Sequence, residues 1–351
     1  MAQVWQVSVW DFFWIIGLIL IVSRLFRKKP TGVITTSKNK HLFTTVVGEV
    51  ITEYIQRTSD NSLEPVLKQN DSTYEDILVI FPGNPGIVDI YDHFVETLSK
   101  DFKTNSYCII AVGLAGHTLN HTIRNLGHVY NLEQQIQSRI NIIKHIRNLY
   151  PKARISLAGH SVGGYLCLQM LSRCDVHIHK VFMLYATIQN MYQTKNAVMY
   201  DGIFKNGIRQ VLVGFAHLIS ILVPSFILDF IVNIARSDDD VSKPFLSKFL
   251  NYNTLSNVIH LAMSEFEQIR ELSERDINIL KQRRKDIYYI FGRDDGWVPL
   301  THVDALDKLI EHDQDAKKQH FVVGLQHNTR HAFVIFKKDV DVVSKFITDR
   351  M

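Results

Sequence analysis

A serine between two glycines is the arrangement in this sequence best suited to nucleophilic chemistry. Gly159, His160, Ser161, Val162 and Gly163 match the G-x-S-x-G pattern, which places a serine on a sharp turn between a strand and a helix. The preceding "RISLA" is predicted to be a buried strand, and the following "VGGYLCLQML" a buried helix. The flanking glycines let strand and helix pack closely. We therefore predict that the serine is a nucleophile.

A serine hydroxyl needs a base to accept its proton, and the base needs an acid to orient it. On this type of turn the partners are expected after later strands, with the acid first. His331 follows the predicted strand "HFVVG" and precedes the last helix, and His327 is the main competitor. Asp294 and Asp295 follow the predicted strand "IYYIF". Either aspartate can serve. We favour Asp295, which lies three residues past the strand-ending Gly292 and just before the Trp-Val-Pro that starts the next helix. The alternative is a loop and N-cap role for both acids.

Two backbone N–H groups are expected to stabilise the oxyanion of the tetrahedral intermediate. The first belongs to Val162, at the start of the helix after the serine. The second is predicted in the tight loop "FPGNPG" (81–86), which follows the strand "DILVI". The Asn84 N–H is the favoured donor there, because Pro85 has no N–H. Taken alone, this loop would be an ordinary turn.

The serine, its base, its acid and the oxyanion donors can meet only if the strands that precede them end at the same edge of a sheet. Apolar strands alternate with helices over 43–186 and again over 281–351, which predicts an α/β core with a mostly parallel sheet covered on both faces. The alternation is interrupted over 187–280, where we predict an inserted helical cap. Ligands of such sheets bind beyond the carboxyl ends of the strands, next to the predicted glycine-rich loops.

Two segments are hydrophobic enough to meet a lipid surface. Residues 1–29 hold an apolar window, 4–23, followed by a basic cluster, so the positive-inside rule places the rest of the chain in the cytosol. A buried N-terminal helix is the alternative. Residues 208–235 are apolar and divided by Pro224. We predict a pair of cap helices that cover the active site or lie in a lipid surface, and a fully buried cap is the alternative. A transmembrane segment would put the last third of the core across the membrane from the first.

Several other classes lack support in the sequence. The net charge of +4 comes partly from one local run of Arg and Lys, so no nucleic-acid-binding face is implied. Three scattered cysteines have no metal-type spacing, and His117 and His121 lack an HExxH context. No nucleotide-binding glycine motif is present. We expect neither a metal nor a cofactor.

The stretches "LVIFPGNPGIVDIYDHFVETL", "LAGHSVGGYLCLQML", "YYIFGRDDGWVP" and "RHAFV" resemble the lipid droplet-associated hydrolases, a family with the α/β-hydrolase fold. The resemblance covers about 46–348. It implies a serine hydrolase at lipid droplets and the endoplasmic reticulum, acting on a lipid ester such as a sterol ester. By motif, it assigns the nucleophile to Ser161, the acid to Asp295 and the base to His331. Gly296 and Gly164 depart from the family, which often has Pro and Ala there.

The sequence thus predicts a cofactor-independent carboxylic ester hydrolase with an acyl-enzyme intermediate. Its expected partners are a lipid ester and the surface of a lipid droplet or of the endoplasmic reticulum membrane, with the catalytic domain facing the cytosol. Two alternatives use the same scaffold: a lipid-surface protein without turnover, and an acyltransferase with the same triad. The acyl chain, the alcohol and the oligomeric state are left open.

Overall fold

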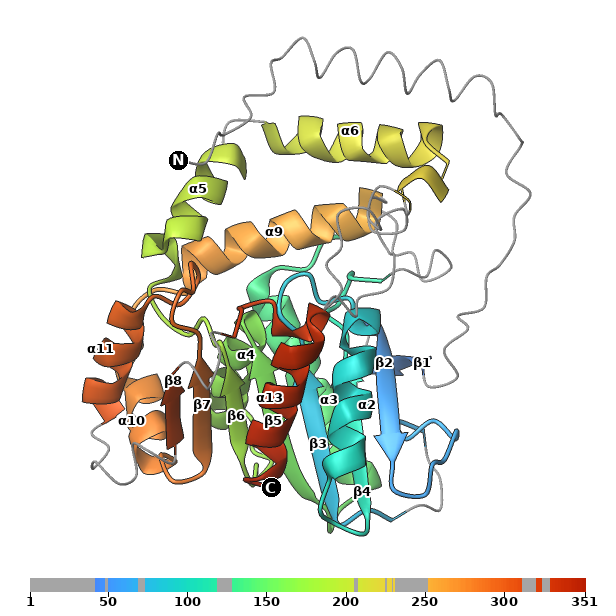
Figure 1. Ribbon diagram of the computed structural model, residues 1–351, viewed down its shortest axis with the longest axis vertical. Coiled ribbons are helices and arrows are strands. Elements are labelled where there is room, and N and C mark those ends of the chain that lie inside the picture. The colour runs from blue at the N-terminus through green and yellow to red at the C-terminus, as the bar shows by residue number, and fades with distance from the viewer. Residues whose placement is uncertain are drawn as a thin grey trace.

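A computed structural model describes residues 42–47, 50–68, 73–118, 128–204, 208–224, 226–228, 230, 252–310, 320–323 and 329–351. These residues form an eight-stranded sheet in the order β1-β2-β4-β3-β5-β6-β7-β8 (Figure 1). β1 and β2 form an antiparallel hairpin, β2 also runs antiparallel to β4, and the pairs from β4 to β8 are parallel. The strands are β1 (Leu42–Val47), β2 (Val50–Thr58), β3 (Asp76–Phe81), β4 (Tyr107–Val112), β5 (Arg154–His160), β6 (Val181–Leu184), β7 (Ile287–Phe291) and β8 (Phe321–Val323).

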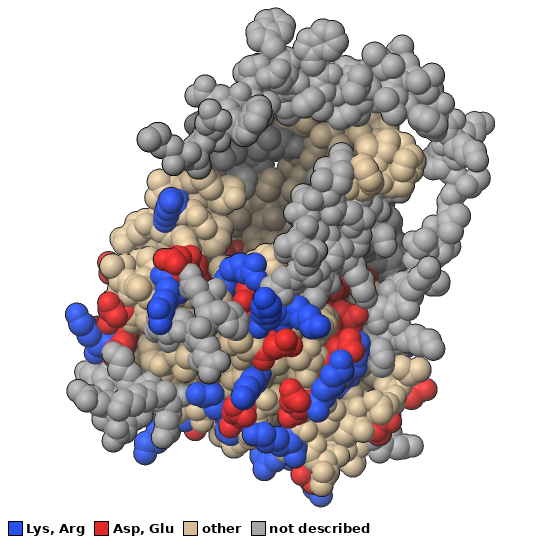
Figure 2. Space-filling model, in the orientation of Figure 1, with Lys and Arg blue, Asp and Glu red and all other residues tan. Residues whose placement is uncertain are grey.

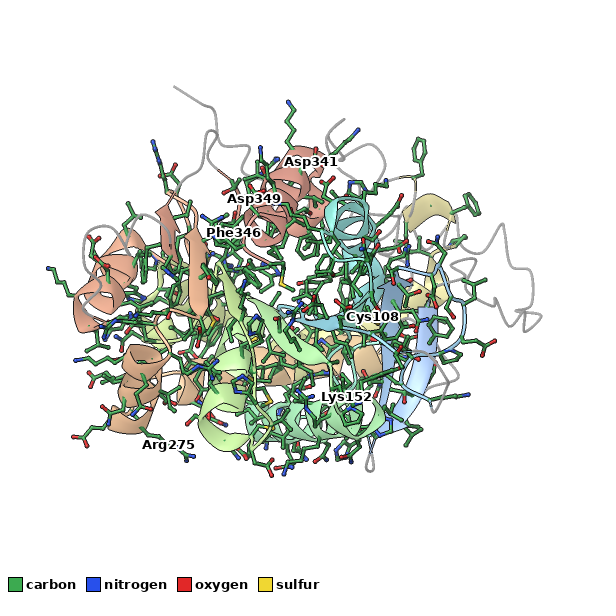
Figure 3. All side chains as sticks on the ribbon, turned by 90° about the horizontal axis from the view of Figure 1, so that it is seen from below. Cys108, Lys152, Arg275, Asp341, Phe346 and Asp349 are labelled. Atoms are coloured by element: carbon green, nitrogen blue, oxygen red, sulfur yellow. The ribbon has the colours of Figure 1, made fainter. Side chains whose placement is uncertain are left out.

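Both faces of the sheet are buried, as the continuous apolar strands predict. In β3, Val79 and Phe81 face one core, whereas Leu78 and Ile80 face the other. Helices α2 (Asp92–Asp101) and α13 (Lys337–Thr348) cover one face, and α3 (Leu132–Leu149) and α4 (Val162–Arg173) the other (Figure 1). Seen from below, Phe346 of α13 and Lys152, just after α3, lie on opposite sides of the sheet (Figure 3). The predicted α/β fold with a mostly parallel sheet is confirmed.

A capping residue fixes the start of α3, whereas the last helix begins later than the sequence predicts. Asn131 caps α3 by accepting a 2.9 Å hydrogen bond from the Gln134 N–H, and the Gln134 side chain accepts one in return from the Asn131 N–H. The last helix was expected from Ala332 onward. Instead, residues Phe333–Ile335 form the short 3-10 helix η3, and α13 begins at Lys337. The extended backbone of Phe336 (φ −122°, ψ 121°) separates the two helices.

Between β6 and β7 the chain leaves the sheet. The 3-10 helix η2 (Met191–Gln193) leads to α5 (Lys195–Phe204), α6 (Ile208–Leu222) and α9 (Tyr252–Gln268), which lie beyond the carboxyl ends of the parallel strands (Figure 1). In contrast, α10 (Glu274–Gln282) packs at the flank of the sheet against α4 and α11 (Leu300–Ile310). No helix in the described ranges is both long and apolar enough to span a membrane. The predicted segment 1–29 and the end of 208–235 lie outside the described residues.

Candidate active site

Ser161 lies on the strained turn between β5 and α4. Its backbone has φ 54° and ψ −121°, a conformation that non-glycine residues rarely adopt. The Ser161 N–H donates to the carbonyl of Leu184 at 3.0 Å. A Cβ atom added at Gly163 would lie 2.1 Å from the carbonyl oxygen of Phe81, and one at Gly159 would lie 2.3 Å from that of Gly163. The two glycines therefore allow the close approach that the sequence pattern predicts.

The three residues proposed as a triad form one chain of hydrogen bonds. Ser161 Oγ lies 3.0 Å from His331 Nε2, and His331 Nδ1 lies 2.7 Å from Asp295 Oδ2. Because a carboxylate oxygen only accepts, Nδ1 carries the hydrogen and Nε2 accepts from the serine hydroxyl. Asp295 Oδ1 accepts from the N–H groups of Trp297 (2.8 Å) and Val298 (3.1 Å), which fix the carboxylate. The arrangement can remove the Ser161 proton.

The competing acid and base are placed differently. Asp295 is buried, with a side chain 1% exposed, whereas Asp294 is exposed. The structure therefore joins Asp295 to His331. His327 lies outside the described residues, as does His121. His117 is buried and accepts a 3.0 Å hydrogen bond from the Gly86 N–H, and the described residues hold no cluster of three metal-ligating side chains.

The loop after β3 lies against the nucleophile. A Cβ atom added at Gly83 would lie 3.0 Å from Ser161 Cβ. The Gly83 N–H donates to Tyr91 Oη at 2.8 Å, and no described residue accepts from the Asn84 N–H. Val162 is the first residue of α4, where N–H groups have no acceptor within the helix. Asn84 and Val162 are thus the two predicted donors that remain available for an oxyanion.

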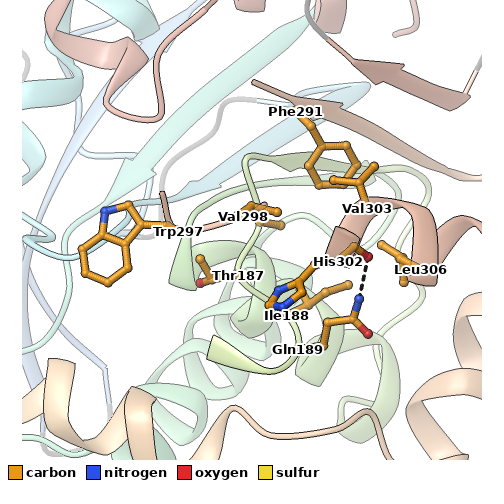
Figure 4. Close-up of a pocket in the computed structure, with 10 residues that line it drawn as sticks. Thr187, Ile188, Gln189, Phe291, Trp297, Val298, His302, Val303 and Leu306 are labelled. Atoms are coloured by element: carbon orange, nitrogen blue, oxygen red, sulfur yellow. Dashed lines mark hydrogen bonds between the residues drawn. The ribbon is translucent and has the colours of Figure 1, made fainter. Parts of the chain in front are cut away.

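A cavity of about 450 Å³ opens over Ser161 and His331, a size typical of small-molecule sites. Its apolar wall includes Ile90, Met191, Val258, Ala262, Phe266, Trp297, Val334 and Ile335. Trp297 also borders a second cavity of about 10 Å³, where Gln189 Nε2 donates to the His302 carbonyl at 2.8 Å (Figure 4). That space holds about one water molecule, so only the larger cavity fits a substrate.

A sequence profile of the lipid-droplet associated hydrolases matches residues 74–334. The chain belongs to this family. The lipid droplet-associated hydrolase of Dictyostelium discoideum is 27% identical to it over 240 residues, which cover 66% of this chain and 76% of the relative. That of Gallus gallus is 24% identical over 272 residues, covering 74% and 80%. The resemblance inferred from the motifs is therefore confirmed, and the protein is a hydrolase.

Solved structures share the fold of this hydrolase at low sequence identity. A bacterial membrane phospholipase A aligns with a TM-score of 0.56 and 12% identity over 96% of this chain and 93% of its own. A carboxylesterase from the thaumarchaeon Nitrososphaera gargenis aligns with a TM-score of 0.55 and 14% identity, covering 88% of this chain and 99% of its own. At such identities the likeness shows the α/β-hydrolase fold alone.

Two groups of the hydrolase's site were missed from the sequence. His160 was assigned only to the turn, yet its Nδ1 lies 2.5 Å from Tyr91 Oη and its Nε2 lies 2.8 Å from the carbonyl oxygen of His331. Burial lowers the pKa of His160 to about 3, so its ring is neutral. These contacts join segments far apart in the chain, and no local pattern indicates them.

Glu265 is the second missed group. It lies on α9, is 1% exposed and lines the cavity that contains Ser161. Its Oε1 accepts a 3.1 Å hydrogen bond from Asn84 Nδ2, which also donates to the Val258 carbonyl at 3.0 Å. Burial raises the pKa of Glu265 to about 8, so the side chain is mostly a neutral acid at pH 7. The sequence of α9 gives no local signal that separates Glu265 from the exposed Glu267.

Proposed function

We propose that this hydrolase is a serine carboxylic ester hydrolase that acts on lipid esters, sterol esters among them, at the surface of lipid droplets and the endoplasmic reticulum. The observation that carries the proposal is the continuous chain from Asp295 through His331 to Ser161, which opens into an apolar cavity. Such a chain activates a nucleophile, and an apolar wall suits a lipid substrate.

In the proposed reaction His331 Nε2 accepts the proton of Ser161 while Oγ attacks the acyl carbon. The N–H groups of Val162 and Asn84 stabilise the oxyanion. When the tetrahedral intermediate collapses, the bond to the alcohol oxygen breaks and His331 returns the proton to that oxygen, leaving an acyl-enzyme. Water, deprotonated by His331, then attacks the acyl carbon. The bond from that carbon to Ser161 Oγ breaks, His331 returns the proton to Oγ, and the fatty acid is released. Asp295 orients His331 throughout, and no cofactor is required.

The same proposal assigns separate tasks to parts of the chain. Residues 43–186 and 281–351 form the hydrolase core, and 187–280 include a cap that meets the lipid surface. Figure 2 shows charged side chains spread over the core, whereas the visible part of α6 is uncharged. The most exposed large apolar side chains described in this region are 63–69% exposed: Val198, Val211, Ile221, Phe226 and Phe230. Residues 1–29 are proposed as a second lipid contact, with the core on the cytosolic side.

The catalytic part of the proposal is tested with a fluorophosphonate probe, which reacts with activated serines. Wild-type protein is expected to be labelled and to release fatty acid from an emulsified lipid ester; Ser161→Ala should do neither. If wild type is not labelled, or Ser161→Ala is labelled equally, the nucleophile assignment fails. Lipid profiles of cells expressing either form would identify the ester, and product diverted to an added alcohol would indicate acyl transfer.

The surface contact is tested with a fluorescent fusion. Replacing Ile221 and Phe226 by Asp is expected to move the protein from droplets toward the cytosol, because two charges would enter the apolar interface. Leu63→Asp is the control, since Leu63 is 50% exposed in the loop after β2, at the edge of the sheet opposite the cap. A diffuse signal from the unmodified fusion, or equal droplet binding by the charged variant, contradicts the proposed contact.

A further inference from the structure

We propose that Tyr91 and His160 are positioning residues that join the oxyanion loop, residues 82–86, to the backbone of His331 through a buried chain of hydrogen bonds. The inference rests on the proposed function, because it concerns the same nucleophile and base. Both line the cavity that contains Ser161, but their hydrogen bonds go to the Gly83 N–H, to each other and to the His331 carbonyl, and none reaches the Ser161 hydroxyl or the His331 ring. Their effect is to hold the donor loop and the base in place around Ser161.

Three hydrogen bonds form this chain. The Gly83 N–H donates to Tyr91 Oη at 2.8 Å, Tyr91 Oη lies 2.5 Å from His160 Nδ1, and His160 Nε2 lies 2.8 Å from the carbonyl oxygen of His331. The contacts connect the loop after β3, the end of β5 and the segment that precedes α13. Three segments distant in sequence are therefore fixed to one another beneath the nucleophile.

The direction of every hydrogen bond follows from the donor and acceptor chemistry. The carbonyl of His331 only accepts, so His160 Nε2 must carry the ring hydrogen. The neutral ring then accepts at Nδ1, and the Tyr91 hydroxyl must donate to it. The Tyr91 oxygen in turn accepts from the Gly83 N–H. Every polar group along the chain is satisfied, and reversing any one bond would leave a buried donor or acceptor without a partner.

Burial and packing keep this arrangement fixed. Tyr91 is 2% exposed and His160 6% exposed. The His160 ring packs edge-on against Phe333, with ring centroids 5.0 Å apart. Burial lowers the pKa of His160 to about 3 and raises that of Tyr91, so neither group changes charge near neutral pH. His160 thus serves as a fixed donor and acceptor and does not compete with His331 for the serine proton.

The chain has two consequences for reactivity. It occupies the Gly83 N–H, which leaves the Asn84 N–H as the donor that the loop offers to an oxyanion. It also holds the backbone of the residue whose side chain accepts the serine proton. Because small displacements of reacting groups lower rates by up to about 100-fold, we expect Tyr91→Phe to lower kcat about 10- to 100-fold with KM changed less than about twofold.

The experiment compares variants of the full-length protein by kcat, KM and the rate of fluorophosphonate labelling. Tyr91→Phe removes the central hydroxyl. His160→Gln keeps a donor that can reach the His331 carbonyl, whereas His160→Leu removes both polar positions. Tyr289→Phe is the control: its hydroxyl is equally buried, has no hydrogen-bond partner among the described residues and lies on β7, outside the cavity.

We expect slow labelling and low kcat for Tyr91→Phe and His160→Leu. His160→Gln should recover at least part of both rates, and Tyr289→Phe should keep wild-type rates. Wild-type rates in folded Tyr91→Phe overturn it, as do equal rates in His160→Gln and His160→Leu. If Tyr91→Phe does not fold, the comparison of His160→Gln with His160→Leu still tests the inference. Unlabelled wild-type protein would instead overturn the proposed function, and this inference with it.

Discussion

The Glu265→Gln variant is expected to change how the stability of this hydrolase depends on pH. Glu265 is a buried residue of the cap helix α9, and its Oε1 accepts from Asn84 Nδ2 at 3.1 Å. Glutamine has nearly the same shape as the neutral acid, and its amide oxygen can keep that hydrogen bond. The substitution therefore removes the titration while it leaves the packing of the cap helix largely intact.

The size of the effect follows from the pKa. Burial raises it from 4.5 to about 8 in the folded protein, so the folded state binds the proton more tightly than the unfolded state. The stabilisation from the bound proton is complete below pH 4.5 and is lost as the pH rises to about 8. Each pKa unit corresponds to about 1.4 kcal/mol, so the free energy of unfolding of wild type loses about 5 kcal/mol across this window through Glu265 alone.

Urea unfolding at pH 5, 6, 7 and 8 measures this contribution. Contributions from other titrating groups cancel when wild type is subtracted from Glu265→Gln. The difference in unfolding free energy should then rise by about 1.4 kcal/mol per pH unit in favour of the variant. Glu267→Gln, which alters an exposed acid on the same helix, should follow wild type. Parallel curves for wild type and Glu265→Gln would refute the reasoning.

Three further predictions concern packing and caps, and urea unfolding checks each. Gly164→Ala should lower the unfolding free energy by about 1–3 kcal/mol, because the new Cβ would lie 2.2 Å from Ala186 Cβ; an unchanged value would show that α4 and the loop after β6 can separate there. Arg139→Met should be neutral or stabilising by up to about 4 kcal/mol. Burial lowers the pKa of Arg139 to about 9, and among the described residues only one of its nitrogens has an acceptor, the Gly113 carbonyl. A clear loss of unfolding free energy would show that the cation is needed. Asn131→Ala should cost about 1 kcal/mol through loss of the α3 cap, and Asn131→Ser should recover most of that loss.

The parts of the site that depend on local pattern were predictable from the sequence. The turn at Ser161 requires a strand, a helix and two glycines within a few residues, and all of these are visible in the letters. The continuous apolar strands predicted a sheet with both faces covered. The order of acid and base along the chain directed attention to His331, which the structure places 3.0 Å from Ser161 Oγ.

Contacts between distant segments were not predictable. The position of Asp295 before Trp297 favoured it over Asp294, but its burial and its contact with His331 depend on how the fold closes. The connections from Tyr91 to His160 and from Asn84 to Glu265 span 69 and 181 residues, so each depends on how the whole fold closes. The predicted cap region also contains α10, which packs at the flank of the sheet against α4 and α11. The hydrophobic pattern along the chain does not indicate where the cap ends and α10 begins.

The backbone conformation of Ser161 has a thermodynamic consequence for the protein as a whole. At φ 54° and ψ −121° a side chain costs about 1–3 kcal/mol, whereas glycine adopts positive φ without this steric cost. Ser161→Gly should therefore unfold at a higher urea concentration than Ser161→Ala, although neither retains the nucleophile. A protein that only bound lipid would be more stable with glycine at this position. Serine at this position therefore carries a conformational cost that the fold itself does not require, which supports its proposed role as the nucleophile.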